Sequence, residues 1–156
     1  MSLRVRTTIL VAESDYSLRA LIGWCLLARG YRVLTAEDGL EAVDRALSNP
    51  PDLIIANAEL TVPAVGTGTF LAYVAGDPRI CAIPVLAIVE SDRTVVPAAR
   101  ILPKPFDEGN LLRAVEGIIG PNRATPPEGI HLLGDSEEAT PVVRLAWDSA
   151  EEPTVS

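Results

Sequence analysis

Aromatic residues and long apolar runs are scarce in this chain of 156 residues. Only 4% of the residues are aromatic although 48% are hydrophobic, so a core has to be built from Leu, Ile, Val and Ala. The longest apolar runs, such as residues 83–89, fall far short of the roughly 20 residues that span a bilayer. The N-terminus also lacks the apolar stretch and cleavage site of a signal peptide. We therefore expect a cytoplasmic protein with no membrane partner.

Basic residues and metal ligands are also in short supply. The net charge is −8, and the 13 Lys and Arg residues are dispersed, so the chain lacks the basic stripe that binds phosphate backbones. Cys25 and Cys81 lie far apart, and the single histidine, His131, is remote from both. This spacing argues against a zinc site and predicts two reduced cysteines that serve as packing residues. We expect neither a nucleic-acid partner nor a bound cofactor.

The composition changes near Gly120, which suggests a boundary between a domain at residues 1–120 and a tail at residues 121–156. The tail holds five prolines, seven acidic residues and two basic ones, so it carries −5 of the net charge. It has too little apolar surface to offset the entropy cost of ordering, and we expect it to be largely disordered. Two short apolar islands interrupt it, at residues 130–133 and 142–147. The second, VVRLAW, contains Trp147 and is interpreted as a partner-binding motif, a strap docked on its own domain, or a passive island.

Before this boundary, short β-branched runs alternate with helical periodicity, which is typical of a parallel sheet wrapped by helices. The expected strands are residues 8–12, 32–35, 53–56, 84–89 and 101–102. The expected helices run from Ser14 or Asp15 to Gly30, over residues 40–47, over residues 69–75, and from Asp107 onward. Between the last two strands the chain is short and contains Pro97, so no regular helix is expected there.

Each helix is expected to bury one face. In the first helix the apolar stripe consists of Leu18, Leu21, Ile22, Cys25 and Leu26. In the final helix it consists of Leu112, Val115, Ile118 and Ile119, with Asp107 as the N-cap.

Four stretches occur in a characteristic order: ILVAESD at 9–15 with Arg19 and Gly30-Tyr31 behind it, AEDGLEAV at 36–43, PDLIIAN at 51–57, and IPVLAIV at 83–89 followed by LPKPF at 102–106. Together, over about residues 7–120, they resemble the receiver domain of bacterial two-component response regulators. The resemblance implies an α/β, flavodoxin-like fold: a five-stranded parallel sheet with helices on both faces. Here its fourth helix should be shortened or lost.

The resemblance also implies a phosphate-accepting aspartate and an acidic pair that binds Mg²⁺, and this sequence departs from both. Asn57 stands at the acceptor position, and an amide cannot form an acyl phosphate. The acidic pair is Glu13-Ser14, so one carboxylate remains where the family has two. Because Mg²⁺ relies on carboxylates, its binding here is expected to be weak or absent.

The switch residues that the family implies are changed as well. Val89 replaces the hydroxyl that would follow the phosphate, and Ile101 replaces the aromatic partner of that hydroxyl. Only Lys104 is retained, before Pro105, for which the family implies a cis peptide bond. Four of the five signature positions therefore disfavour phosphate or its readout.

Two residues have alternative interpretations. Lys104 is interpreted as a relic phosphate anchor or, preferably, as an ammonium paired with Glu13; Glu13 in turn is a residual metal ligand or an acceptor for Lys104 or nearby backbone. Trp24 is interpreted equally well as an exposed anchor for a partner or as a residue packed at the sheet edge.

The sequence therefore predicts a degenerate receiver, or pseudo-receiver. It is not expected to be an enzyme, but a phosphorylation-independent adaptor or scaffold that binds a protein partner in a bacterial signalling or polarity system. Trp24 and Trp147 are the candidate partner contacts. The alternative is a phospho-accepting receiver that signals from a histidine kinase. A small-molecule sensor using the apolar pocket beside Val89 and Ile101 is a third possibility. The partner and the oligomeric state do not follow from the sequence.

Overall fold

The computed structural model describes residues 6–63, 68–91 and 93–120. Five parallel strands form one sheet in the order β2-β1-β3-β4-β5. The strands are β1 (Thr8–Ala12), β2 (Arg32–Ala36), β3 (Leu53–Asn57), β4 (Val85–Val89) and β5 (Arg100–Pro103). Each expected strand is found to within one residue at either end, and the flavodoxin-like sheet is confirmed. The expected disorder of residues 121–156, and any role of Trp147, lie outside the described residues.

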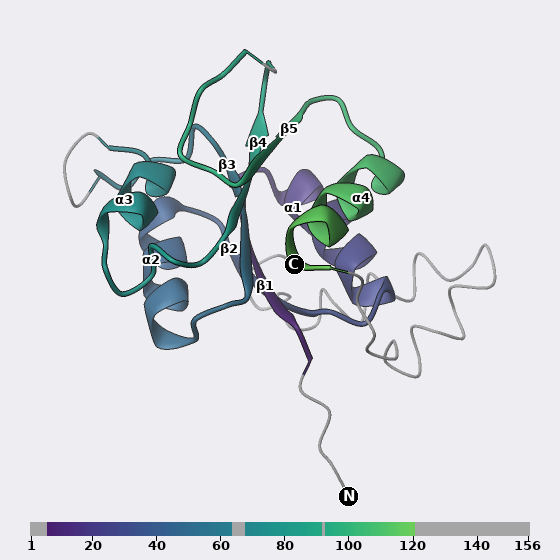
Figure 1. Cartoon of the computed structure of the whole chain (residues 1–156), viewed down its shortest axis with the longest axis horizontal. Coiled ribbons are helices and arrows are strands. Elements are labelled where there is room, and N and C mark those ends of the chain that lie inside the picture. The colour runs from purple at the N-terminus through teal and green to yellow at the C-terminus, as the bar shows by residue number, and fades with distance from the viewer. Residues whose placement is uncertain (1–5, 64–67, 92, 121–156) are drawn as a thin grey trace, which may run out of the picture.

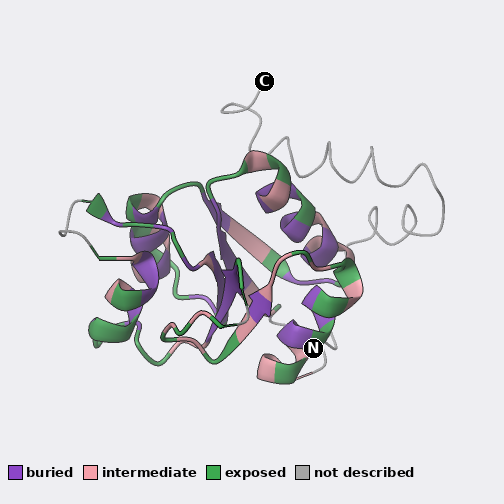
Figure 2. Cartoon of the chain, turned by 90° about the horizontal axis from the view of Figure 1, so that it is seen from above, coloured by how far each residue is buried: buried purple, intermediate pink, exposed green. Residues whose placement is uncertain are grey.

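In the described part of the chain, four helices enclose the sheet. They are α1 (Tyr16–Ala28), α2 (Gly39–Ser48), α3 (Phe70–Gly76) and α4 (Glu108–Ile119). Helices α2 and α3 cover one face and α1 and α4 the other, so buried side chains line both sides of the central strands (Figures 1 and 2). None of the described helices combines the length and the hydropathy required to cross a bilayer.

Side-chain caps fix where the helices begin. Asp15 accepts hydrogen bonds from the backbone N–H groups of Ser17 and Leu18, at 2.9 and 3.3 Å, and so starts α1 directly after β1. Asp107 and Asn110 form a reciprocal capping box at the start of α4. Caps of this kind contribute about 1 kcal/mol each, because they satisfy N–H groups that have no partner within the helix.

The core departs from the expected stripes at three places. Leu21 is 50% exposed, because it lies outside the stripe that Ile22, Cys25 and Leu26 turn toward the sheet. Ile118 and Ile119 are only partly buried, because they lie in the last turn of α4 at the margin of the core. The fully buried face of α4 consists instead of Leu111, Leu112, Ala114 and Val115.

The connection between β4 and β5 contains no helix in its described residues, 90–91 and 93–99, as expected. It runs on the side of the sheet that carries α2 and α3 (Figure 1). Because the described part of this connection has no helix, the final helix, Glu108–Ile119, is numbered α4. Cys81, in the loop before β4, is exposed, so its expected role as a packing residue is wrong; Cys25 is buried as expected. The difference arises because Cys81 lies in a loop at the surface, whereas α1 turns Cys25 toward the core.

Asp77, which caps the end of α3, gives the fold an acid-sensitive point. Its carboxylate accepts bonds from the Arg79 backbone N–H and from Nε and Nη2, at 2.9, 3.0 and 2.7 Å, and these bonds hold its pKa below the usual range. A lowered carboxyl pKa stabilises the fold above the unfolded-state pKa of about 4, and this contribution is lost as the pH falls further.

We therefore expect Asp77→Asn to flatten the loss of stability below about pH 4. Urea unfolding across the acid range measures this, with Asp44→Asn, an exposed acid on α2, as the control. Identical acid slopes for the wild type and Asp77→Asn would contradict the assignment.

Candidate functional site

The candidate site lies at the carboxyl edge of the sheet, where parallel strands bring their ends together. Asn57 ends β3, Val89 ends β4, Glu13 follows β1, and Lys104 follows β5. The structure places Glu13 and Asn57 in contact: the Asn57 amide Nδ2 donates to the Glu13 carboxylate, at 3.2 Å from Oε1 and 3.5 Å from Oε2. Two residues 44 positions apart in the sequence thus form the centre of the site.

Glu13 is nearly inaccessible, with 2% of its surface exposed. Its Oε2 also accepts a bond of 2.9 Å from the backbone N–H of Asp15. A buried carboxylate is costly unless it is hydrogen-bonded, and here amide donors supply those bonds. The prediction that nearby backbone pairs with Glu13 is confirmed. Ser14, beside it, is exposed.

Both polar atoms of the Asn57 side chain form hydrogen bonds. While Nδ2 donates to Glu13, Oδ1 accepts a bond of 2.8 Å from the backbone N–H of Glu59 in the loop after β3. This orientation of the amide is the one that chemistry requires, because an ionised carboxylate accepts bonds and cannot donate them. An asparagine therefore fits this position better than an aspartate, which would offer Glu13 a second carboxylate.

Arg19 holds the backbone of the loop that carries Glu13. This role was not predicted from the sequence. Only 4% of its surface is exposed, and its Nη1 donates to the Glu13 backbone carbonyl at 2.8 Å. Its guanidinium carbon also lies 5.4 Å from the centre of the Tyr16 ring. An arginine on the inward face of α1 was the available signal, since a buried arginine needs an acceptor. Arg19 thus ties α1 to the loop that carries Glu13.

Lys104 does not pair with Glu13, so the preferred interpretation of this lysine is wrong. Its Nζ lies 3.1 Å from Oε2 of Glu90, the residue after β4, and both side chains reach solvent. Glu13 already receives amide donors, whereas the exposed Glu90 is free to meet the ammonium. Exposed ion pairs contribute little, about 0–1 kcal/mol. The Lys104-Pro105 peptide bond is cis, as the resemblance implied.

The wall of the site toward β4 and β5 is apolar. Val89 is 2% exposed and belongs to the core beneath the site, and Ile101 is partly buried against the same cluster. Neither side chain can form a hydrogen bond. The described part of the chain contains no group of three acidic, His or Cys residues placed to hold a metal ion.

Comparison with known proteins identifies the fold family. No protein-family model matches the sequence. The chain is 28% identical over 118 residues to a curated protein of Pyropia yezoensis, "Probable transcriptional regulator ycf29", covering 71% of this chain but only 52% of that protein. The chain therefore spans about half the length of the curated relative.

Solved structures match over almost their whole length. The response regulator CheY4 of Vibrio cholerae superposes with a TM-score of 0.65 at 25% identity, over 73% of this chain and 99% of CheY4. The receiver domain of the hybrid histidine kinase CckA is 30% identical, with a TM-score of 0.57, over 70% of this chain and 96% of that domain. The chain belongs to the receiver-domain family. It is thus a response regulator receiver domain of two-component signalling.

Trp24 in this receiver is half-buried and packs against the core between the sheet and helices α1 and α4. Its indole N–H is buried, and it has no hydrogen-bond partner within the described residues. A partner could reach only part of the ring. The structure therefore favours the packed alternative over the exposed anchor.

We expect Trp24→Ala to lower the free energy of unfolding by about 1–2 kcal/mol, less than a fully buried indole loses, because the side chain is only partly buried against the core. Leu21→Ala, an exposed position on the same helix, is the control and should change stability by no more than about 0.5 kcal/mol. Urea unfolding of both variants provides the measurement. Equal, small losses for the two would place Trp24 on the free surface and restore the anchor alternative.

Proposed function

We propose that this receiver is a phosphorylation-independent adaptor or scaffold, which acts by binding a protein partner and catalyses no reaction. The observation that carries the proposal is the Asn57 amide at the acceptor position, bonded to Glu13 on one side and to the Glu59 backbone on the other. Formation of an acyl phosphate requires a carboxylate oxygen to attack phosphorus. The amide oxygen of Asn57 is a poor nucleophile and already accepts a bond.

The donor set does not fit the Mg²⁺ ion of a working receiver. Mg²⁺ keeps an octahedral shell at short distances and is bound through carboxylates. Among the four residues that define the candidate site, Glu13 carries the one carboxylate, and its oxygens accept bonds from Asn57 and Asp15. An ion would have to displace the amide of Asn57 without gaining a second charge. We infer that the receiver needs no metal.

The parts that would read out a phosphate support the same proposal. A ligand shifts a conformational equilibrium only by its differential affinity for the two states. Val89 offers no hydroxyl to an oxyanion, and Ile101 carries no polar group that could follow it. Both positions pack in or against the core, so neither side chain can move to form a hydrogen bond with an anion at the site.

The competing function is a receiver that accepts a phosphoryl group from a histidine kinase. The family membership is compatible with it, and so are the kinase-linked relatives, such as the CckA receiver. At the acceptor position, however, Asn57 supplies no carboxylate nucleophile. The curated relative is described as a transcriptional regulator and is about twice as long as the matched part, so an output on transcription would require residues beyond those compared.

We expect no phosphorylation when the protein is incubated with acetyl phosphate and Mg²⁺, because Asn57 supplies no carboxylate. Intact-mass spectrometry measures this, before and after hydroxylamine treatment. The proposal fails if a hydroxylamine-sensitive addition of one phosphoryl group appears. In the same preparation, a protein partner captured by the full chain should be retained equally with and without acetyl phosphate.

A further inference from the structure

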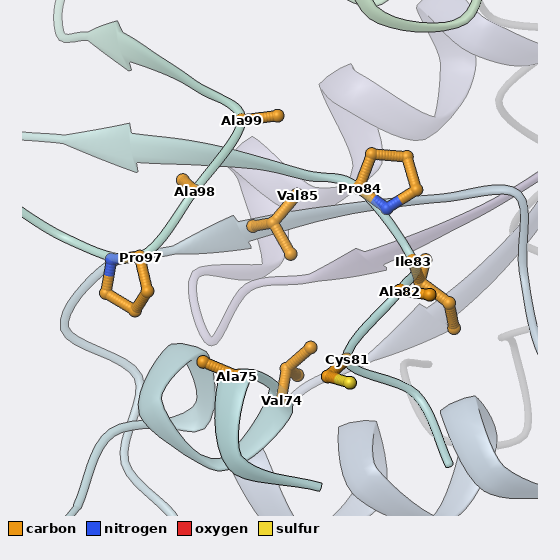
Figure 3. Close-up of a pocket in the computed structure, with 10 residues that line it drawn as sticks. All are labelled: Val74, Ala75, Cys81, Ala82, Ile83, Pro84, Val85, Pro97, Ala98 and Ala99. Atoms are coloured by element: carbon orange, nitrogen blue, oxygen red, sulfur yellow. The ribbon is translucent and has the colours of Figure 1, made fainter. Parts of the chain in front are cut away.

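An apolar groove lies on the side of the sheet that carries α3, remote from the candidate site. It encloses about 360 Å³ between the end of α3, the loop before β4 and the segment before β5. Its lining contains no charged side chain and consists of Val74, Ala75, Cys81, Ala82, Ile83, Pro84, Val85, Pro97, Ala98 and Ala99. Figure 3 shows Cys81 beside Val74, with Pro97 and Ala98 across the opening.

The groove exists because this part of the core has no helix over it. The described residues of the β4–β5 connection, 90–91 and 93–99, form turns and bends where a helix would otherwise cover the sheet beside α3. The hydrophobic residues there, Ile83, Val96, Ala98 and Ile101, are only partly buried against the core, and Val95 is 94% exposed. An apolar face of this kind favours a further apolar segment.

The described chain ends near the start of β5, at the edge of the sheet next to the groove but on the face that α4 covers. Arg100, the first residue of β5, follows directly on Ala99 in the groove lining, and its guanidinium lies against Gly117 in the last turns of α4. A side chain at Gly117 would collide with it. Gly120 follows α4 immediately, so the chain leaves the domain on the β5 side, near the start of that strand.

We propose that residues 142–147 of the same chain, VVRLAW, dock in this groove. The 21 residues from Pro121 to Pro141 can extend to ~70 Å, far beyond the ~14 Å radius of gyration of a domain of this size. A segment tethered in this way is present at an effective concentration of about millimolar, which favours docking within the chain over docking between chains.

Apolar composition selects this segment. Residues 142–147 provide Val142, Val143, Leu145, Ala146 and Trp147, whereas the other island, at 130–133, provides three aliphatic side chains.

The test uses the thiol of Cys81, which the docked segment would shield. The full chain is treated with iodoacetamide under native conditions, and the modification of each cysteine is followed by peptide mass spectrometry. The test variant is the double substitution Leu145→Asp and Trp147→Asp. The matched control is Leu132→Asp and Leu133→Asp, which also replaces two apolar side chains with carboxylates, in the other island.

We expect Cys81 to react about tenfold faster in the test variant than in the wild type and the control, because the segment no longer shields it. Added carboxylates near a thiol slow its reaction, so the acceleration cannot come from charge. Cys25 reports on folding: it is buried, burial raises its pKa to about 12, and it should stay unmodified in every sample.

Equal Cys81 rates in the wild type and the test variant would overturn the proposal. Acceleration in the control instead would overturn it in favour of residues 130–133. Protection that disappears on dilution would overturn it in favour of a second copy of the chain. Acceleration confined to the test variant and independent of protein concentration supports docking within the chain.

Discussion

Replacing Asn57 by Asp is expected to lower the free energy of unfolding by about 2–4 kcal/mol at about pH 8. The substitution replaces the amide donor, 3.2 Å from the Glu13 carboxylate, with a second negative charge. Glu13 is 2% exposed, so water screens the repulsion poorly. The hydrogen bond is lost at the same time. Asn49→Asp makes the same chemical change at an exposed position and should cost no more than about 0.5 kcal/mol.

The pH dependence of Asn57→Asp tests the cause. Two adjacent carboxyls cannot both ionise easily, so in the folded variant one of them has a pKa above its unfolded value of about 4. A raised folded-state pKa stabilises the protein at low pH, and this contribution is lost as the pH rises through that value. The deficit relative to the wild type should therefore vanish at about pH 4 and grow toward neutrality. Urea unfolding at several pH values measures it.

Millimolar Mg²⁺ should restore part of the lost stability in Asn57→Asp and have no effect on the wild type, since only the variant offers two carboxylates. The switch should nevertheless stay inactive. Amide NMR shifts on adding Mg²⁺ and a phosphate mimic are expected only around Glu13, position 57 and Lys104. Large shifts that reach β5 and α4 would show that a working switch remains, despite Val89 and Ile101.

Gly39→Ala is expected to cost about 2–3 kcal/mol, because the first residue of α2 has no room for a side chain. A Cβ there would collide with the backbone carbonyl of Thr61 and would lie 2.8 Å from the Val62 side chain. Backbone cannot move aside as a flexible side chain does. The loop after β3 or the start of α2 must therefore shift, and this loop begins next to Asn57.

Gly76→Ala is the matched control for Gly39→Ala, since Gly76 ends α3 and a Cβ there would meet nothing within 4 Å. It should be neutral, or stabilising by up to about 1 kcal/mol, because alanine restricts the unfolded chain. Thermal or urea unfolding of the two variants separates collision from helix propensity. Similar effects at both positions would rule out the close approach to Thr61 as the cause.

The sequence allowed the sheet and the position of the site to be predicted, because both depend on local signals. β-branched runs marked the strands, and parallel strands necessarily bring Glu13, Asn57 and Lys104 to one edge. The cap at Asp107 was also predictable, since a short acidic side chain preceding an amphipathic segment has few other roles.

The partners of the charged residues could not be predicted in the same way. Lys104 pairs with Glu90 because of the conformation of the loop after β4, and no local pattern encodes that conformation. Arg19 is buried because the backbone carbonyl of Glu13 lies within its reach, a contact that depends on how α1 packs. The exposure of Leu21 likewise depends on how α1 is rotated against the sheet, where a difference of one residue decides which side faces water.

The hydrogen-bonded amide at Asn57 also has a consequence for timing. A carboxyl phosphate hydrolyses, so a signal stored in one decays at a rate set by the protein that carries it. The Asn57–Glu13 hydrogen bond contains no group that hydrolyses, so it sets no decay rate. In a receiver that acts by binding alone, the duration of the signal is set by the dissociation rate of the complex and by how much of each protein the cell makes and degrades.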